Sequence, residues 1–287
     1  MLDNSKNNFE NMLLGAVLLA FLLLVGVCLR GEILFAADAN QSAKKKHPSD
    51  PNDKKPNRPQ HNHPAFGQRA RERAKMVARQ IKARSVTDPN VLKAMRTVPR
   101  HSFVRQSDLR RAYEDHPLPI GMGQTISQPY IVGYMTEKLN LDPNHKVLEV
   151  GTGSGYQAAV CAEIAKQVFT IEIIEALANS SGKRLKELGY NNVSVKAADG
   201  YYGWEEKAPF DAIIVTCAAG FIPQPLIKQL KPGGIMILPL GSPFGYQSLI
   251  LVTKDNKGGV RSKTLLPVRF VPMLGRITKN KKTDAEK

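Results

Sequence analysis

One stretch of the chain has a glycine spacing that suits close contact between the backbone and a ligand. It consists of Gly151, Thr152, Gly153, Ser154 and Gly155. Glu149 lies two residues upstream in an apolar run, and a helix-forming run follows at residues 157–165. A glycine turn between a strand and a helix presents backbone N–H groups and lets a ligand approach the main chain. The sequence therefore predicts that Glu149 and the five turn residues contact a cofactor.

Two acids follow at the ends of later apolar runs. Glu172 is placed to accept hydrogen bonds from two ribose hydroxyls. Asp199, followed by Gly200, could accept from an adenine amino group or fix its own loop. Dinucleotide enzymes share the glycine turn and the ribose acid, but their usual pattern is G-x-G-x-x-G. The G-x-G-x-G spacing here favours a cofactor with a sulfonium and an amino acid tail over one with a pyrophosphate.

A segment rich in proline, glycine and hydroxyl residues precedes the glycine turn. Residues 113–129 are expected to form a shaped loop, and a helix is expected to begin near Gln128 or Pro129. Ser127 occupies a natural N-cap position for that helix, and spacing alone favours this capping role. No G-x-S-x-G elbow surrounds Ser127, so its useful chemistry would be hydrogen bonding to a substrate.

Strands and helices must position these residues, and their order predicts the fold class. Strands are expected at 146–150, 168–171, 193–197, 211–216 and 234–238, with late strands at 244–253 and 265–273 and helices at 176–188 and 223–230. Apolar strands that alternate with helices indicate a doubly wound α/β fold, with a mostly parallel seven-stranded sheet covered on both faces. Ligands of such sheets bind beyond the carboxyl ends of the strands, where the glycine turn, Glu172, Asp199 and Gly200 fall.

Helices are predicted before the loop as well. Residues 69–84 have the spacing of an amphipathic helix, with Val77 and Ile81 among its apolar residues. Asp88 and Pro89 form a start signal for a second helix. His101 lies just past the end of that helix and is expected to be structural.

Composition divides the chain into four segments. Residues 1–43 form a hydrophobic anchor or signal-like segment, 44–67 a disordered basic linker rich in proline, 68–280 a catalytic domain with a substrate-loop subdomain at 68–140, and 281–287 a disordered tail. The net charge is +16, and residues 44–84 alone, with 13 basic and three acidic groups, carry +10. Much of the basicity therefore lies in the linker and the residues directly after it, and the linker is expected to be a solvated or membrane-adjacent tether rather than a nucleic-acid site.

The apolar run at residues 12–29 carries no charge and is about long enough to span a membrane. Lysines follow it, so an uncleaved anchor would hold the domain on the cytoplasmic side of the membrane, as the positive-inside rule implies. The alternative is a signal peptide that is cleaved near Ala39 and exports the domain. The favoured hypothesis is an anchor, with a cytoplasmic domain tethered to the inner face of the membrane, or else a dispensable extension.

No metal site is predicted. Cys28, Cys161 and Cys217 are far apart and form no C-x-x-C pair, so they are expected to be buried apolar residues. His47, His61 and His63 lie in the polar linker and are expected to be solvated.

Several separate segments resemble the protein-L-isoaspartate O-methyltransferases, class I enzymes that use S-adenosyl-L-methionine. They are residues 98–101, 112–115, 119–121, 123–129, 147–156, 209–216, 230–234 and 268–272. The specific part is the loop of Gln124, Thr125, Ile126 and Ser127, because the glycine turn is common to many methyltransferases. The resemblance covers roughly residues 68–277. It implies that Ser127 is the active-site residue rather than the helix cap that spacing alone favours, and that Gln124, Thr125 and Ile126 belong to the substrate loop.

The reaction implied by this resemblance is methyl transfer to the free α-carboxylate of L-isoaspartyl residues in damaged proteins and peptides, which starts repair through a succinimide. A carboxylate is ionised at neutral pH and needs no general base, and a sulfonium needs no metal. The catalytic domain is expected to be a monomer. Two alternatives remain: a nicotinamide-dependent oxidoreductase, and a non-catalytic tethered module that binds through the basic linker.

Overall fold

The computed structural model describes residues 58–242 and 245–277. The predictions for the segment 1–43, for residues 44–57 of the linker and for the tail 281–287 lie outside the described residues. Among the residues that are described, none of the helices combines the length and the apolar character that crossing a membrane requires.

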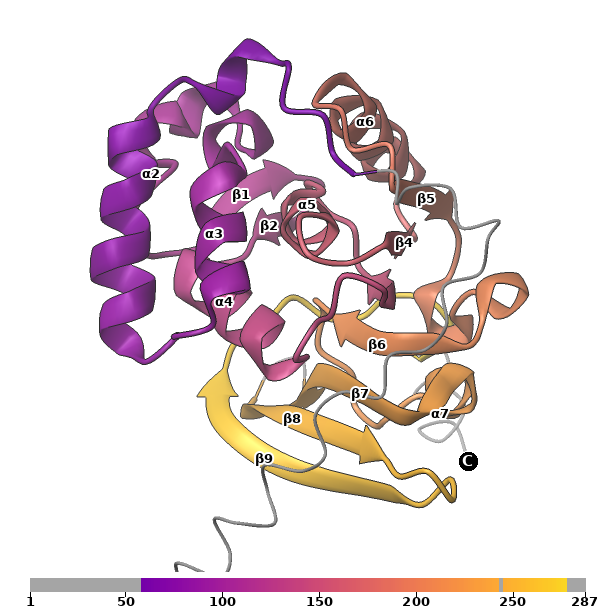
Figure 1. The fold of residues 1–287 in the computed structure, drawn as a ribbon. Coiled ribbons are helices and arrows are strands. Elements are labelled where there is room, and N and C mark those ends of the chain that lie inside the picture. The colour runs from indigo at the N-terminus through magenta and orange to yellow at the C-terminus, as the bar shows by residue number, and fades with distance from the viewer. Residues whose placement is uncertain (1–57, 243–244, 278–287) are drawn as a thin grey trace, which may run out of the picture. The chain divides into compact units, whose positions relative to one another are not determined.

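A seven-stranded sheet forms the centre of the described part, in the order β5-β4-β3-β6-β7-β8-β9 (Figure 1). Its strands are β3 Lys146–Val150, β4 Gln167–Glu172, β5 Val193–Ala197, β6 Phe210–Val215, β7 Leu230–Gly241, β8 Gln247–Lys254 and β9 Val260–Val268. The strands from β5 to β7 pair in parallel, and β8 and β9 are antiparallel to their neighbours. The predicted fold class, a mostly parallel seven-stranded sheet, is confirmed.

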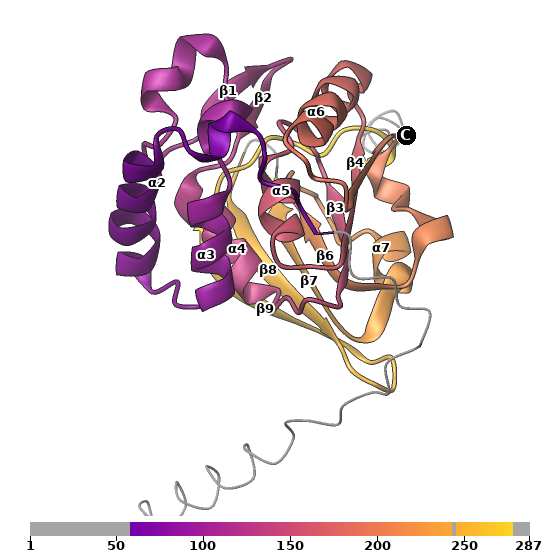
Figure 2. The same ribbon diagram turned by 45° about the horizontal axis from the view of Figure 1, so that its top comes forward.

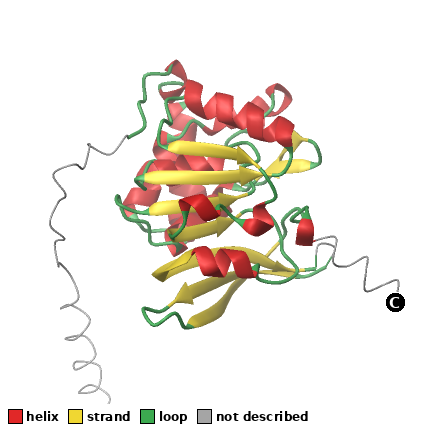
Figure 3. Ribbon diagram, turned by 90° about the vertical axis from the view of Figure 1, so that its right-hand side faces the viewer, coloured by secondary structure: helices red, strands yellow, loops and turns green. Residues whose placement is uncertain are grey.

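Helices cover both faces of the sheet (Figures 2 and 3). They are α2 Ala70–Met76, α3 Pro89–Thr97, α4 Pro129–Lys138, α5 Tyr156–Ala162, α6 Glu175–Glu187 and α7 Gln224–Gln229. In β3, Val147 packs into a core that includes residues of α3 to α6, whereas Leu148 packs into a second core that includes Leu226 of α7. Because successive side chains of a strand point to opposite faces, an apolar strand can bury both.

The amino-terminal helices follow the predicted pattern. α2 continues directly into the short helical turns η2 Val77–Ile81 and η3 Lys82–Arg84, and both Val77 and Ile81 are buried. Asp88 caps α3, since its side chain accepts hydrogen bonds from the N–H groups of Asn90 and Val91 at 2.8 and 2.9 Å. The predicted start of this helix is confirmed.

The segment 113–129 contains more regular structure than a loop. Strands β1 Leu118–Gly121 and β2 Gln124–Ile126 form a small antiparallel hairpin inside it. The predicted capping role of Ser127 is wrong, because Gln128 occupies the N-cap position of α4 and Pro129 the first helical position. Proline has no N–H group to be capped and its fixed φ suits this position, so α4 can begin without a serine cap.

The late strands lie elsewhere than predicted. β8 begins at Gln247 rather than at residue 244, and β9 ends at Val268 rather than continuing to residue 273. A turn in which the Asp255 carboxylate accepts the N–H groups of Lys257 and Gly259 joins the two strands into a hairpin. The first half of β9 is exposed and polar, so no apolar run marked it in the sequence.

Packing against the domain begins before residue 68, so the predicted linker boundary at residue 67 is too late. Ala65 is buried, and Gln60 N–H donates to the carbonyl of Gly189 at 3.0 Å. His61 Nε2 lies 2.8 Å from Glu163 Oε1, and His63 Nδ1 accepts the N–H of Ala65. Both histidines are exposed, as predicted, but they make these contacts rather than lying in a free linker. Apolar contacts and backbone pairing hold a segment whose composition alone suggested disorder.

Replacing Gly189 tests this attachment. Gly189 has φ +83°, and a Cβ there would collide with the carbonyl oxygen of Gln60. Gly258 is the matched control, because its φ of +88° is similar and its Cβ would meet nothing within 4 Å. We expect Gly258→Ala to lower the free energy of unfolding by about 1 kcal/mol, the cost of a left-handed alanine. Gly189→Ala should lower it further in urea titrations. Equal losses would show that residues 60–66 move aside at no cost.

Candidate active site

The ends of three parallel strands meet at one edge of the sheet. Val150 of β3 is in register with Ile171 of β4 and with Val215 of β6. Beyond these positions Gly151 N–H donates to the Ile171 carbonyl at 2.8 Å, and Thr216 N–H donates to the Val150 carbonyl at 2.9 Å. The glycine turn, Glu172 and Thr216 therefore lie side by side. The sequence predicted this position for the glycine turn and for Glu172.

Only glycine fits at the start of the turn. Gly151 has φ +100°, and a Cβ there would lie 2.5 Å from the hydroxyl oxygen of Thr216. That hydroxyl donates to the Gly151 carbonyl at 2.6 Å. Gly155 also has a positive φ, but its Cβ would press on Leu185 of α6 at 3.1 Å. Gly151 thus permits the close approach of two strand ends, and Gly155 the packing of a helix.

Glu172 closes the turn with its carboxylate. Oε2 accepts the N–H of Gly153 at 2.8 Å, and Oε1 accepts the N–H of Ile174 at 3.0 Å. A carboxylate has about four acceptor positions, so each oxygen can still accept one more hydrogen bond. Glu172 can therefore stabilise the turn and accept ribose hydroxyls at the same time.

Glu149 has a different environment from Glu172. Its side chain is fully buried, and Oε2 accepts the hydroxyl of Thr170 at 2.5 Å. Oε1 has no hydrogen-bond partner within the described part of the chain. Burial, with a smaller contribution from the nearby charge of Glu172, raises the pKa of Glu149 to about 8.

Asp199 serves its own loop rather than lining the cavity. Its Oδ1 accepts the N–H of Tyr201 at 2.9 Å, and Oδ2 accepts the N–H of Arg276 at 2.7 Å. The second of the two predicted roles, fixing the loop, is the one that this geometry supports. The next residue, Gly200, faces the cavity described below.

A cavity of about 750 Å³, open to solvent, lies at the strand ends. Of the predicted cofactor residues, seven line it: Glu149, Gly151, Thr152, Gly153, Ser154, Glu172 and Gly200. Gly155 and Asp199 do not. Across residues 58–242 and 245–277, no group of three or more His, Cys, Asp or Glu side chains is arranged to hold a metal ion.

The predicted substrate loop forms one wall of this cavity. Gln124, Thr125, Ile126 and Ser127 all line it. Thr125 and Ser127 also line a second cavity of about 960 Å³, so the two cavities meet at this loop. Ser127 is half-buried there, and its hydroxyl has no hydrogen-bond partner among the described residues.

Sequence reasoning missed the wall formed by the carboxy-terminal segment and the end of β6. Thr216 and Val271 line both cavities, and Cys217 lines the first. The segment is held by Ala218, whose N–H donates to the Val271 carbonyl and whose carbonyl accepts the N–H of Met273, both at 2.8 Å. Residues 268–272 carried part of the family resemblance, which was the available signal for their place at the site.

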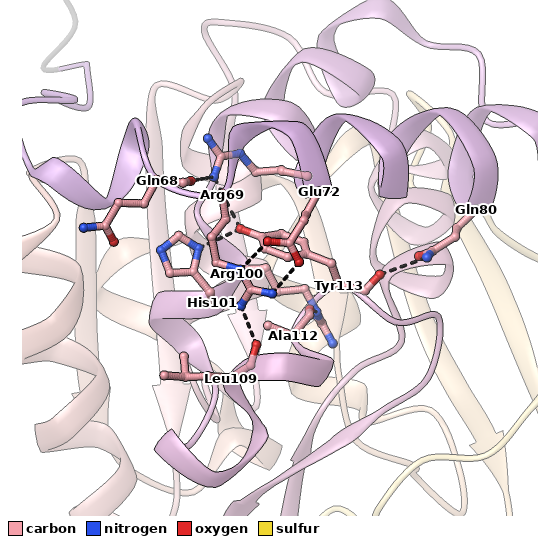
Figure 4. A network of polar contacts seen from close by, with 10 residues as sticks. Gln68, Arg69, Glu72, Gln80, Arg100, His101, Leu109, Ala112 and Tyr113 are labelled. Atoms are coloured by element: carbon pink, nitrogen blue, oxygen red, sulfur yellow. Dashed lines mark hydrogen bonds and ion pairs between the residues drawn. The ribbon is translucent and has the colours of Figure 1, made fainter.

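Buried polar contacts hold the start of the substrate loop (Figure 4). The Arg100 side chain is fully buried; its Nε donates to the Ala112 carbonyl at 2.9 Å, and its guanidinium lies over the ring of Tyr156. Gln80 donates to the Tyr113 carbonyl, and His101 Nδ1 lies 2.7 Å from the Tyr113 hydroxyl. Arg100 therefore connects Ala112, just before the segment 113–129 that contains the substrate loop, to α5, the helix that follows the glycine turn. The expectation that His101 is structural agrees with this contact.

His101 should make stability depend on pH. Burial, with nearby arginines, lowers the pKa of His101 from 6.5 to about 4. The unfolded chain therefore binds a proton at His101 below pH 6.5, whereas the folded protein binds it only near pH 4. The contribution of His101 to the free energy of unfolding is thus intact above pH 6.5 and is lost on acidification. We expect wild type to lose about 2–3 kcal/mol more than His101→Asn between about pH 7 and 4.5 in urea titrations. Other groups titrate in both proteins and cancel in the difference. Parallel pH profiles would contradict a neutral buried histidine.

The comparisons with known proteins agree with this geometry. The family model for Protein-L-isoaspartate(D-aspartate) O-methyltransferase (PCMT) matches residues 71–278. The Protein-L-isoaspartate O-methyltransferase 2 of Syntrophobacter fumaroxidans is 56% identical over 212 residues, which are 71% of this chain and 86% of the relative. The Protein-L-isoaspartate O-methyltransferase 1 of Nitrosospira multiformis is 58% identical over 71% of this chain and 87% of its own.

Solved structures share the fold over most of the domain. A protein-L-isoaspartate O-methyltransferase, 30% identical, superposes with a TM-score of 0.67 over 73% of this chain and 69% of its own. A β-aspartate methyltransferase (PCMT) from Plasmodium falciparum, in complex with S-adenosyl-L-homocysteine, is 25% identical and superposes with a TM-score of 0.59 over 70% of this chain and 98% of its own. With a family model that spans nearly the whole described domain and relatives more than half identical to it, the chain belongs to the protein-L-isoaspartate(D-aspartate) O-methyltransferase family.

Proposed function

We propose that the first cavity holds S-adenosyl-L-methionine, that the second holds an L-isoaspartyl peptide, and that Ser127 binds the peptide's free α-carboxylate between them. As a member of its family, the chain methylates L-isoaspartyl residues of damaged proteins and so starts their repair. The observation that carries the assignment of roles is that Thr125, Ser127 and Thr216 line both cavities.

The residues of the first cavity fit a cofactor with a ribose and a charged tail. The backbone of the glycine turn lies open beside it, and Glu172 keeps acceptor capacity for ribose hydroxyls. The orphaned Oε1 of Glu149 adds an unused polar atom to the same lining. The neighbouring P. falciparum structure, which contains S-adenosyl-L-homocysteine, supports the choice of cofactor.

The second cavity fits a peptide. Its lining includes Pro117, Ile131, Pro267 and Phe270, and Arg269 is its one charged residue within the described chain. Apolar walls of this kind leave the peptide's charged α-carboxylate with few partners other than hydroxyls, backbone groups and Arg269. Broad tolerance of peptide sequence is the expected consequence.

The chemistry needs little from the protein beyond alignment. When bound, the cofactor supplies an electrophilic methyl group on a sulfonium. The attacking carboxylate is already ionised at neutral pH, so the site needs no general base. Ser127 can orient one carboxylate oxygen by donating a hydrogen bond, and such positioning is a major source of rate. The methyl ester is then attacked by the neighbouring amide nitrogen, methanol leaves, and hydrolysis of the succinimide regenerates some aspartate.

The central test is methyl transfer to an isoaspartyl peptide beside its aspartyl twin, with wild type and Ser127→Ala. Wild type should methylate only the isoaspartyl peptide. Because the hydroxyl contacts the carboxylate and not the cofactor, Ser127→Ala should lower kcat/KM by about 10- to 100-fold, the loss of one hydrogen bond to a charged group. Its dissociation constant for S-adenosyl-L-homocysteine should stay within about twofold of wild type, since no contact to the cofactor is removed.

Gln124→Ala is the matched control, because Gln124 lines the first cavity but not the second. It should leave the KM for the peptide closer to wild type than Ser127→Ala does. Equal losses of cofactor binding and turnover in Ser127→Ala would overturn the role of Ser127. Transfer to neither peptide would overturn the proposed function.

Glu172 is tested with a pair of ligands, because its carboxylate also supports the turn. Wild type should bind S-adenosyl-L-homocysteine about 10- to 100-fold more tightly than the 2′-deoxy analogue, since a hydrogen bond to a charged acceptor is lost. In Glu172→Ala both affinities should fall through damage to the turn, and the preference for the ribose should disappear. Isothermal titration measures all four dissociation constants. A preference that survives in the variant would assign the ribose hydroxyls to another acceptor.

A further inference from the structure

Two carboxyl groups line the first cavity, and their surroundings differ. Glu172 receives two backbone N–H groups, one on each carboxylate oxygen. Glu149 is fully buried; Oε2 accepts the hydroxyl of Thr170, and the N–H of Ala158 has a weaker favourable effect on the carboxylate, while Oε1 has no partner at hydrogen-bond distance in the described part of the chain. A buried carboxylate with an unsatisfied oxygen is costly, so Glu149 holds a proton.

The groups around Glu149 supply no compensating cation. From β4 it faces Thr170 and, at the strand end, the charge of Glu172, which raises its pKa further. The thiols of Cys161 on α5 and Cys217 after β6 are also nearby, and burial raises the pKa of both. Both thiols are therefore neutral at neutral pH. No described Lys, Arg or His contributes to the shift in the pKa of Glu149, so a cationic ligand would supply the charge that balances it.

We propose that Glu149 is a proton-linked counter-charge for the cationic cofactor: it is protonated in the empty site, releases that proton when S-adenosyl-L-methionine binds, and regains it once the methyl group has been transferred. This inference rests on the cofactor assigned above.

The physical basis is the change in charge of the bound molecule. A positive charge within about 4–6 Å lowers the pKa of a carboxyl group by about 1 to 3. Starting from about 8, such a change makes Glu149 ionised at neutral pH. S-Adenosyl-L-homocysteine has a neutral thioether in place of the sulfonium, so Glu149 stays protonated beside it.

Charge balances through the reaction. A carboxylate oxygen of the substrate forms a bond to the methyl carbon, the carbon–sulfur bond breaks, and its electron pair stays on sulfur. The substrate's negative charge and the sulfonium's positive charge disappear together, which leaves Glu149 as an uncompensated buried anion. Glu149 then takes a proton from solvent. The site therefore favours the substrate cofactor over the product more strongly as pH rises.

The test is isothermal titration of the full chain with both ligands at about pH 6.8, in phosphate and in Tris, whose different ionisation enthalpies report protons exchanged. S-Adenosyl-L-methionine should release about 0.8 of a proton per site and S-adenosyl-L-homocysteine close to none. The α-amino group is common to both ligands and cancels in the comparison. Between about pH 6.5 and 8 the affinity ratio of the two ligands should change about tenfold in favour of S-adenosyl-L-methionine.

Glu149→Gln should abolish both the extra proton release and the pH dependence of the ratio. The matched control Glu163→Gln, which makes the same chemical change at a carboxylate paired with His61 outside the cavity, should leave them unchanged. Equal proton release with the two ligands, or release that persists in Glu149→Gln, would overturn the linkage. Failure of both ligands to bind would instead overturn the proposed cofactor.

A measurement without ligand guards against a variant that folds poorly. A carboxyl group whose folded pKa is raised stabilises the folded state below its unfolded pKa of about 4.5 and loses that contribution as pH rises to about 8. The stability of wild type relative to Glu149→Gln should therefore fall across this range in urea titrations. A constant difference would show that Glu149 is ionised in the empty site and would overturn the proposal. If Glu149→Gln does not fold, the difference in proton release between the two ligands on the wild type still tests the proposal.

Discussion

The site depends on hydrogen bonds that tie the ends of three parallel strands together. Gly151 N–H bonds to the end of β4, and Thr216 N–H bonds to the end of β3, so each strand end lies one hydrogen bond from its neighbour. The Thr216 hydroxyl then occupies the space where any side chain at position 151 would begin. Each strand end contributes to the lining of the cavity: the glycine turn follows β3, Glu172 ends β4, and Thr216 follows β6.

The carboxy-terminal segment adds a further wall to the cavities that lie at the strand ends. It pairs with Ala218, just beyond β6, and so places Val271 in the lining of both cavities, together with residues of the substrate loop. Asp199 binds the N–H of Arg276 and anchors the far end of this segment. Asp199, which the sequence suggested for adenine, is thus bonded to the carboxy-terminal segment, and its neighbour Gly200 lines the cavity.

Patterns of neighbouring residues predicted the features that depend on neighbouring residues, such as strand bounds and a helix cap. The bounds of β3 and β5 were confirmed, because an apolar strand between turns is visible in the sequence, and so was the Asp88 cap, which depends on neighbours in sequence. The first half of β9 was missed because exposed edge residues carry no apolar signal. The partner of Asp199 lies 77 residues away, and no pattern reports such a contact. The same holds for Thr216, whose place at both cavities depends on strand register.

The two alternative functions are not favoured by these findings. A dinucleotide-dependent oxidoreductase would require a different glycine spacing, and the family assignment covers the whole domain that carries the chemistry. A non-catalytic module that binds through the linker would not account for the two adjoining cavities or for the segment held by the buried Arg100.

The position of Ser127 shows how helix geometry frees a functional group. The hydroxyl oxygen of a serine at the N-cap of a helix usually accepts a hydrogen bond from a backbone N–H group of the first turn. Here the chain places Gln128 at the N-cap and Pro129 at the first helical position, so the N-cap falls one residue after Ser127 and needs nothing from its side chain. The hydroxyl remains unpaired among the described residues, at the boundary of two cavities. A shift of the helix start by a single residue would turn the same serine into a cap and remove the donor that the carboxylate needs.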